Sequence, residues 1–243
     1  MRKNLTLRYL DDGTIDLYEV EMPEPGPGEV LLEGGACGIC SWDVATAKQG
    51  KEAPAMAPPG HEGMAHVTAV GAGVEGIAEG DRVVCGPTGP DKGAFSTCRT
   101  APASSVHKLP ESEIKDEHWL VEPASCVVTG IDRSEIKIGD KVALIGCGYM
   151  GLMFVQALVR SFAGEVVGLD VAETRLEKAK ELGLDEVYRI GTDGDEALIA
   201  ELEARAFDVV IDTSGAAAGF DTATRIVKPA GLVNLFGWVK GTE

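Results

Sequence analysis

The 243-residue chain is 44% hydrophobic, enough to form two domains of ordinary size with separate cores. Its 39 acidic and 22 basic residues give a formal charge of −17, which argues against binding to nucleic acid or to an anionic membrane. No stretch approaches the roughly 20 apolar residues of a membrane span, and the first residues lack a signal peptide's apolar core. The sequence therefore predicts a cytoplasmic protein whose six cysteines are thiols or metal ligands.

The composition of the chain changes near residue 125. Residues 1–125 are rich in turns, Gly and Pro, whereas residues 126–243 alternate apolar runs with helical patterns. We therefore predict two domains, 1–125 and 126–243, of which the second has the α/β organisation of a dinucleotide-binding fold.

The first half holds thiol, imidazole and carboxylate groups whose chemistry suits zinc. They lie in four places, CGICSWD at 37–43, GHE at 60–62, His66, and Glu122 before Pro123. A catalytic zinc takes about three protein ligands and leaves one coordination position open, whereas a structural zinc is closed by four. Cys40, His61 and Glu122 fit the open type. Glu62, which follows His61 directly, is a further candidate ligand.

The second half begins with a strand, a glycine turn and a helix in succession. Residues 141–145 form a short apolar run that leads into Gly146-Cys-Gly-Tyr-Met-Gly151 and an apolar helical stretch at 152–162. The first glycine permits a tight turn, the second lets the backbone approach a pyrophosphate, and the third lets the helix pack on the strand. This arrangement predicts a dinucleotide site.

An acidic residue strengthens that prediction. The apolar run at 165–169 ends in Asp170, where the fold places a carboxylate against the adenosine ribose. A carboxylate there accepts hydrogen bonds from both ribose hydroxyls and repels a 2′-phosphate, so we expect NAD rather than NADP, with Arg175 as a nearby cation. The candidate cofactor-binding residues are Gly146, Gly148, Tyr149, Met150, Gly151, Asp170, Arg175 and Ser214.

The alternation of helices and strands continues to the end of the chain. Helical spacing is present at 173–182, 195–204 and 220–227, and apolar strands are expected at 186–190, 207–215 and 232–237. Together with the two strands above, this predicts five parallel strands joined by four crossovers.

Several of these segments resemble the zinc-dependent medium-chain dehydrogenase/reductase family of alcohol dehydrogenases. The similar segments read ACGICSWD, PPGHEG, VGAGVEGIAEGDRVV and LVEPASCVVTGI, while IGCGYMGLMFVQ and LDVAETRLEKAKELGLDEV resemble its sorbitol dehydrogenase branch. The resemblance implies a GroES-like, β-rich catalytic domain over 1–125 and an incomplete Rossmann NAD-binding domain over 126–243. It also implies hydride transfer between an alcohol or polyol and NAD.

The resemblance assigns roles to individual residues. It implies Cys40 and His61 as zinc ligands, and Glu62 and Glu122 as a ligand and a close neighbouring group that exchange roles. Asp43 resembles the acid that holds the zinc-bound imidazole in the correct tautomer. Cys37 forms a C-x-x-C motif with Cys40, which also occurs in thioredoxin-like redox pairs, but the resemblance gives zinc only to the second cysteine.

The chain departs from the family in three places. Trp42 stands where many relatives have a Ser or Thr that relays the substrate proton. The segment after GDRVV retains only Cys85 and Cys98, too few for a four-ligand site, so we expect one catalytic zinc and no structural zinc. The sequence ends after the fifth expected strand, so part of a typical relative is expected to be missing.

Two other functions remain open at this stage. The first is a truncated, non-catalytic remnant that still binds NAD, which Trp42 and the short C-terminus favour and the complete ligand set opposes. The second is a zinc-free quinone or enoyl reductase of the same fold. Both a monomer and a homo-oligomer are open, because in relatives the missing strand forms the dimer interface.

Overall fold

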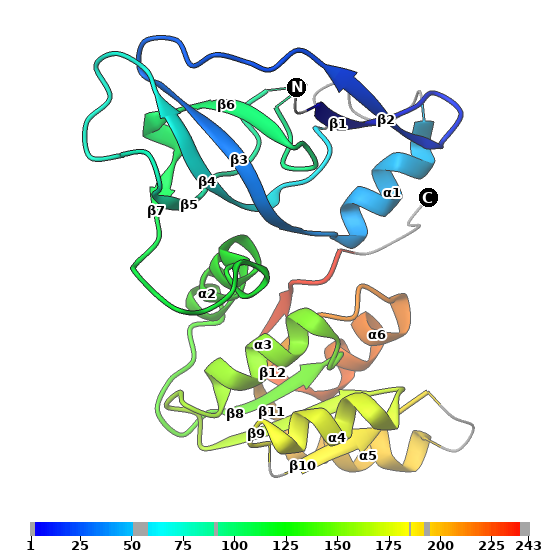
Figure 1. The fold of residues 1–243 in the computed structure, drawn as a ribbon. Coiled ribbons are helices and arrows are strands. Elements are labelled where there is room, and N and C mark those ends of the chain that lie inside the picture. The colour runs from blue at the N-terminus through cyan, green and yellow to red at the C-terminus, as the bar shows by residue number, and fades with distance from the viewer. Residues whose placement is uncertain (1–2, 51–57, 90–91, 185, 192–194, 239–243) are drawn as a thin grey trace. The chain divides into compact units, whose positions relative to one another are not determined.

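The computed structural model describes residues 3–50, 58–89, 92–184, 186–191 and 195–238. The chain forms two compact units, Met1–Pro123 and Ala124–Glu243 (Figure 1). The first unit is rich in β-strands and the second contains a sheet flanked by helices. The predicted α/β class is confirmed. The units divide between residues 123 and 124, whereas the sequence analysis placed the boundary after residue 125.

The first unit is built on an antiparallel five-stranded sheet with the order β6-β3-β4-β5-β7. Its strands are β3 (Glu29–Gly38), β4 (Glu62–Val70), β5 (Arg82–Val84), β6 (Cys98–Pro102) and β7 (His107–Lys108). β1 (Asn4–Tyr9) and β2 (Ile15–Val20) form a separate antiparallel pair. In β3, Val30 and Leu32 are fully buried because alternate residues of a strand point to the same face.

A buried guanidinium holds the segment that follows β5. Arg99 on β6 is 6% exposed, and it donates hydrogen bonds to the carbonyls of Cys85, Gly86 and Lys92 at 2.6, 3.0 and 3.2 Å. These carbonyls lie in the segment after GDRVV, for which the sequence analysis expected no structural zinc. Cys85 and Cys98 are both buried thiols. The absence of a structural zinc stays a prediction.

We expect Arg99→Met to lower the free energy of unfolding by about 2–4 kcal/mol, because one buried and two partly buried carbonyls lose their donor. Urea denaturation of the purified protein measures this change. The control is Arg8→Met, because Arg8 is exposed and lies over the ring of Tyr18. Equal stability of the two variants would contradict the expectation.

The second unit is a five-stranded parallel sheet with the order β10-β9-β8-β11-β12. The strands are β8 (Lys141–Ile145), β9 (Glu165–Asp170), β10 (Glu186–Arg189), β11 (Phe207–Asp212) and β12 (Val227–Leu235). The helices are α2 (Val121–Arg133), which begins in the first unit, α3 (Tyr149–Leu158), α4 (Glu173–Glu181), α5 (Glu196–Arg205) and α6 (Ala217–Ile226). The five predicted parallel strands are thus present, in the order that Rossmann folds adopt.

Helices cover both faces of this sheet. One core cluster joins alternate residues of β8 to α3 and α4, with Leu144, Phe154 and Leu176 at its centre. The other cluster joins the opposite face to α5 and α6, through residues such as Leu202 and Ile226. Both faces of each central strand are buried, which explains the uniformly apolar run at 142–145.

Some boundaries differ from those expected. α3 begins at Tyr149 rather than at 152, because Gly148 is the N-cap and the helix follows the glycine turn directly. β12 begins at Val227 rather than at 232 and includes Pro229. Proline is tolerated there because β12 is an edge strand of the sheet.

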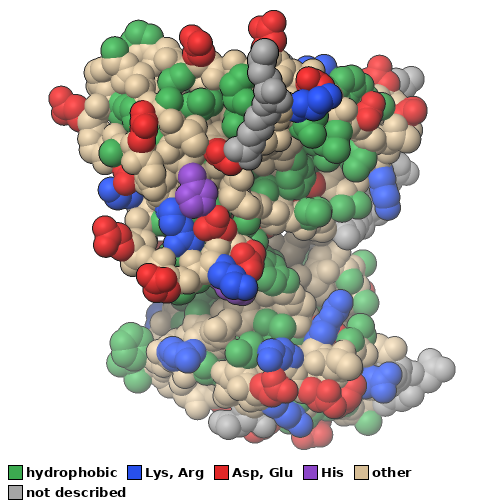
Figure 2. Space-filling view, viewed as in Figure 1, with side chains coloured by type: hydrophobic (Ala, Val, Ile, Leu, Met, Phe, Trp, Pro, Cys, Tyr) green, Lys and Arg blue, Asp and Glu red, His purple; other side chains and the backbone are tan. Residues whose placement is uncertain are grey.

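Charged side chains are spread over the face of the molecule drawn in Figure 2, where acidic and basic groups are interspersed. In the part of the chain that the structure describes, none of the helices combines the length and apolarity needed to cross a bilayer.

Candidate active site

Three of the predicted ligands come together in the first unit. Cys40 lies between β3 and α1 (Ser41–Gln49), His61 directly precedes β4, and Glu62 is the first residue of β4. Their ligand atoms all lie within 4.8 Å of one another. Among the described residues, this is the group of Cys, His and acidic side chains that could hold a metal ion. Glu62 is buried, and Cys40 and His61 are partly buried.

Asp43 ties the segments carrying these ligands together. It is 2% exposed, and its carboxylate accepts the Cys40 N–H at 2.9 Å and the Gly60 N–H at 3.3 Å. Its Oδ1 also lies 3.4 Å from Nδ1 of His61. Burial alone would raise the pKa of Asp43, but the interactions with His61 and the Cys40 N–H outweigh it and lower that pKa. Asp43 is therefore charged and faces one nitrogen of the imidazole.

Tyr9 is a further contact of Asp43 that the sequence analysis missed. Its hydroxyl, on β1, donates to Oδ1 of Asp43 at 3.1 Å. Burial, together with the negative charge of Asp43, raises the pKa of Tyr9, so the phenol stays protonated and remains a donor. No motif marks this residue, because the contact depends on tertiary packing between positions 34 residues apart.

The two glutamates differ in position. Burial raises the pKa of Glu62, the charge of His61 lowers it, and the charge of Glu122 raises it further. The carboxylate of Asp43, whose Oδ1 lies 3.4 Å from Nδ1, raises the pKa of His61, and the charge of Glu122 acts in the same direction. Glu122 lies in the first turn of α2 and is not part of the group within 4.8 Å. The electrostatic influence of Glu122 thus reaches the group from outside it.

The donor set fits zinc. A thiolate, an imidazole and a carboxylate are the ligand types of catalytic zinc sites, whose ligand atoms lie roughly 3.3–3.7 Å apart. The observed spread, up to 4.8 Å, needs only a small contraction. Because Asp43 faces Nδ1 of His61, Nε2 is the nitrogen left for a metal.

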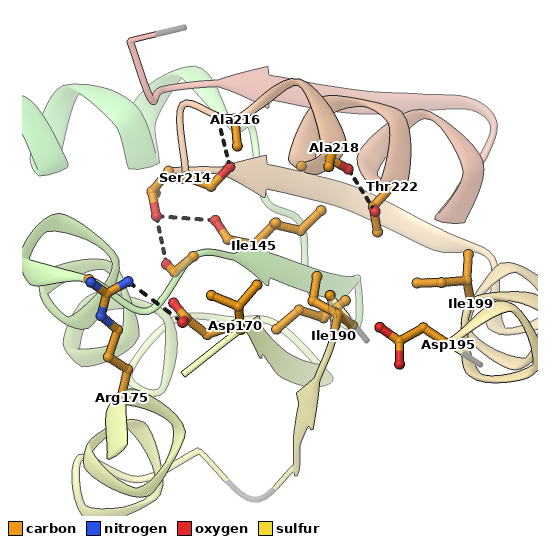
Figure 3. Close-up of a pocket in the computed structure, with 17 residues that line it drawn as sticks. Ile145, Asp170, Arg175, Ile190, Asp195, Ile199, Ser214, Ala216, Ala218 and Thr222 are labelled. Atoms are coloured by element: carbon orange, nitrogen blue, oxygen red, sulfur yellow. Dashed lines mark hydrogen bonds and ion pairs between the residues drawn. The ribbon is translucent and has the colours of Figure 1, made fainter. Parts of the chain in front are cut away.

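The second unit contains a cavity of about 480 Å³ at the carboxyl ends of its strands (Figure 3). Five of the predicted cofactor residues line it, namely Gly146, Gly148, Asp170, Arg175 and Ser214. Isoleucine side chains from β8, α5 and the segment after β10 add apolar wall. The cavity lies where open α/β sheets bind nucleotides.

The backbone fixes the carboxylate of Asp170 within this cavity. Oδ2 accepts the Cys147 N–H at 2.6 Å, and Oδ1 accepts the Ala172 N–H at 2.8 Å. Arg175 extends toward the same carboxylate in Figure 3, with its guanidinium 3.6 Å from Oδ1. The acid and the cation thus stand together at one end of the cavity.

The glycine turn has the geometry that the motif requires. Gly146 has φ +90°, in the left-handed region that favours glycine. A Cβ at Gly151 would collide with the carbonyl of Gly146, so helix and turn pack too closely for a side chain. A Cβ at Gly148 would meet no atom within 4 Å, so that glycine leaves open space.

Three predicted cofactor residues are outside the cavity lining, namely Tyr149, Met150 and Gly151. Met150 packs on the core, and Tyr149 is 60% exposed on the first turn of α3. Their side chains do not line the cavity because α3 begins at Tyr149, which directs them away from the turn.

Family models match both halves of the chain. Residues 26–111 match the alcohol dehydrogenase GroES-like domain, and residues 150–243 match the zinc-binding dehydrogenase domain. The two matched regions correspond to the two compact units.

Full-length relatives are similar over almost the whole chain. The (R,R)-butanediol dehydrogenase of Bacillus subtilis is 30% identical over 270 residues, covering 97% of this chain and 78% of the relative. Human sorbitol dehydrogenase is 29% identical over 266 residues, covering 96% of this chain and 74% of the relative. The chain therefore spans about three quarters of the length of these dehydrogenases.

Solved structures show the same fold. A zinc-binding dehydrogenase from Sinorhizobium meliloti, bound to NADP, superposes with a TM-score of 0.85 at 26% identity, covering 100% of this chain and 79% of that one. The 2R,3R-butanediol dehydrogenase of Bacillus subtilis gives 0.79 at 26% identity, covering 99% and 79%. Similarity in both halves, in sequence and in fold, means that the chain belongs to the zinc-dependent medium-chain dehydrogenase/reductase family, in its sorbitol dehydrogenase-like branch.

Proposed function

We propose that this chain transfers a hydride between a small-molecule alcohol or polyol and NAD, at one zinc ion held by Cys40, His61 and Glu62. The observation that carries the proposal is the convergence of these three ligand types within 4.8 Å in a member of this family. Glu122 is proposed as the nearby carboxylate that exchanges with Glu62.

Each residue of the metal group has a definite task in this proposal. Bound zinc would make the alcohol hydroxyl more acidic, and bound NAD would accept the hydride. Asp43, whose carboxylate faces Nδ1 of His61, would hold the proton on that nitrogen and leave Nε2 to bind the metal. The capping contact from the Trp42 N–H to Sγ, at 3.5 Å, orients Cys40 at the start of α1.

The cofactor half has a corresponding division of tasks. The backbone from Gly146 to Gly151 would cradle the pyrophosphate at the N-terminus of α3. Asp170, fixed by two backbone N–H groups, would accept the ribose hydroxyls. The isoleucine walls of the cavity suit the flat, largely apolar surface of an adenine ring.

Metal analysis combined with cofactor reduction tests the proposal. Protein purified with zinc should contain about one ion per chain and should reduce NAD in the presence of an alcohol from a panel of alcohols and polyols. Zinc binding without turnover would favour the non-catalytic remnant. Turnover of a quinone or enoyl substrate without metal would favour the zinc-free reductase.

We expect Asp170→Asn to shift cofactor preference toward NADP. The substitution removes the charge that repels a 2′-phosphate and releases Arg175, now 3.6 Å from the carboxylate, to pair with that phosphate. The ratio of kcat/KM for NAD to that for NADP should fall about 10-fold or more. Steady-state kinetics with both cofactors measures the ratio, and an unchanged ratio would remove Asp170 from the ribose site.

We expect Tyr9→Phe to weaken zinc binding by about 3- to 10-fold, because Asp43 loses the donor that orients it toward His61. Competition with a chromophoric chelator measures the affinity. Tyr18→Phe is the matched control, since Tyr18 lies on the partner strand β2 under Arg8. If both variants bind zinc equally well, Tyr9 has no part in holding the metal group.

A further inference from the structure

The side chain of Trp42 lies directly beside the proposed metal group. Its ring and that of His61 meet edge to face, with centroids 5.6 Å apart and planes at 89°. The backbone of Trp42 is tied to Cys40 by the hydrogen bond from its N–H to Sγ. The position of the indole is therefore fixed by two proposed ligands: Cys40, two residues earlier in the chain, and His61, whose ring it contacts.

Trp42 also forms a wall of an open cavity of about 380 Å³. The lining residues are Trp42, Pro58, His61 and Pro87. Three of these four present apolar rings, and the fourth is a member of the metal group. A molecule that reacts at the metal would thus rest part of its surface on an indole and two pyrrolidine rings.

A wall of this kind is expected to discriminate between kinds of alcohol. Contact between a short hydrocarbon group of the substrate and these apolar rings makes the binding free energy more favourable, because both surfaces leave water. A chain of hydroxyl groups would lose its hydrogen bonds to water without finding partners on those rings. The indole N–H can donate a hydrogen bond but cannot accept one, so Trp42 cannot relay a proton in place of a serine or threonine hydroxyl.

We propose that Trp42 determines substrate specificity, and that the substrate is an alcohol whose carbinol carbon carries a short hydrocarbon group rather than a sugar polyol. The inference rests on the proposed function, since it names the substrate class of the same site. It separates this chain from the relatives named sorbitol dehydrogenase.

The test compares butan-2-ol with sorbitol as substrates of the zinc-loaded protein with NAD. The wild-type protein should favour butan-2-ol in kcat/KM by about 100-fold, and Trp42→Ser should narrow that ratio by about 10-fold or more. Trp42→Phe should keep the preference, because phenylalanine preserves an apolar ring. Trp119→Phe is the control in the same unit, and its ratio should equal that of the wild type.

A binding measurement without turnover complements the kinetics. The chain has three tryptophans, all in the described part of the chain, of which only Trp42 lines this cavity. Because butan-2-ol would rest on Trp42, it should change the tryptophan fluorescence of the NAD-free wild-type protein but not that of Trp42→Phe. This readout also holds if Trp42→Ser fails to fold. A wild-type preference for sorbitol, an unchanged ratio in Trp42→Ser, or equal fluorescence changes in the wild type and Trp42→Phe would overturn the inference while leaving the dehydrogenase function intact. Absence of turnover with every alcohol would instead overturn the proposed function, and the inference with it.

Discussion

Cys40→Ala should abolish stoichiometric zinc binding and lower the rate of alcohol oxidation by at least about 1000-fold. The thiol of Cys40 is one of three ligand atoms within 4.8 Å, and two remaining protein ligands are too few for a catalytic zinc site. The loss of rate follows because the metal supplies several kcal/mol of charge stabilisation in such reactions. Elemental analysis of the purified protein and NAD reduction measure the two effects.

Cys37→Ala provides a matched control three positions earlier in the chain. Cys37 is outside the metal group, and burial raises the pKa of its thiol to about 12, so it is a poor thiolate ligand. This variant should retain about one zinc per chain and most of its activity. If the two cysteine variants lose zinc to the same extent, the ion is bound in another way, as by a C-x-x-C pair.

Gly148→Ala should lower the affinity for NAD about 100-fold while leaving the stability of the protein nearly unchanged. A Cβ at this position meets no protein atom within 4 Å, and the residue has φ −72°, which alanine adopts without strain. The added methyl group would instead occupy the space where the motif brings the backbone against the pyrophosphate. Equilibrium titration with NADH fluorescence and thermal unfolding measure the two quantities.

Two comparisons make this prediction specific. Gly151→Ala should damage the fold as well as NAD binding, because its Cβ would collide with the carbonyl of Gly146. Gly86→Ala, at a position equally open but in the first unit, should affect neither property. Normal NAD affinity in Gly148→Ala would place the cofactor elsewhere than on this turn.

The sequence predicted the parts of the molecule that depend on neighbouring residues. The strand at 141–145, the glycine turn and Asp170 lie in one βαβ unit, so their spacing along the chain already describes their arrangement in space. The family of the chain was likewise predicted from short segments and is confirmed by the relatives. The early start of α3 was missed, because an apolar pattern marks the buried face of a helix and not its first turn.

Features that depend on tertiary packing were beyond sequence reasoning. Tyr9 reaches Asp43 only because of how the first unit packs, and Arg99 reaches three carbonyls only after β6 pairs with β3. The cavity beside Trp42 depends on Pro58 and Pro87, which belong to separate loops. No spacing rule predicts such contacts. The roles of Cys40, His61, Glu62 and Glu122 as ligands remain predictions that the variants above test.

The guanidinium of Arg99 holds the loop after β5 through hydrogen bonds to three carbonyl oxygens, and it keeps its charge at all accessible pH values. Neither chelators nor thiol oxidants can remove these bonds. Stripping metal from this protein should therefore switch off its chemistry without loosening that loop. Repeated cycles of demetallation and reloading should then return the protein to full zinc content.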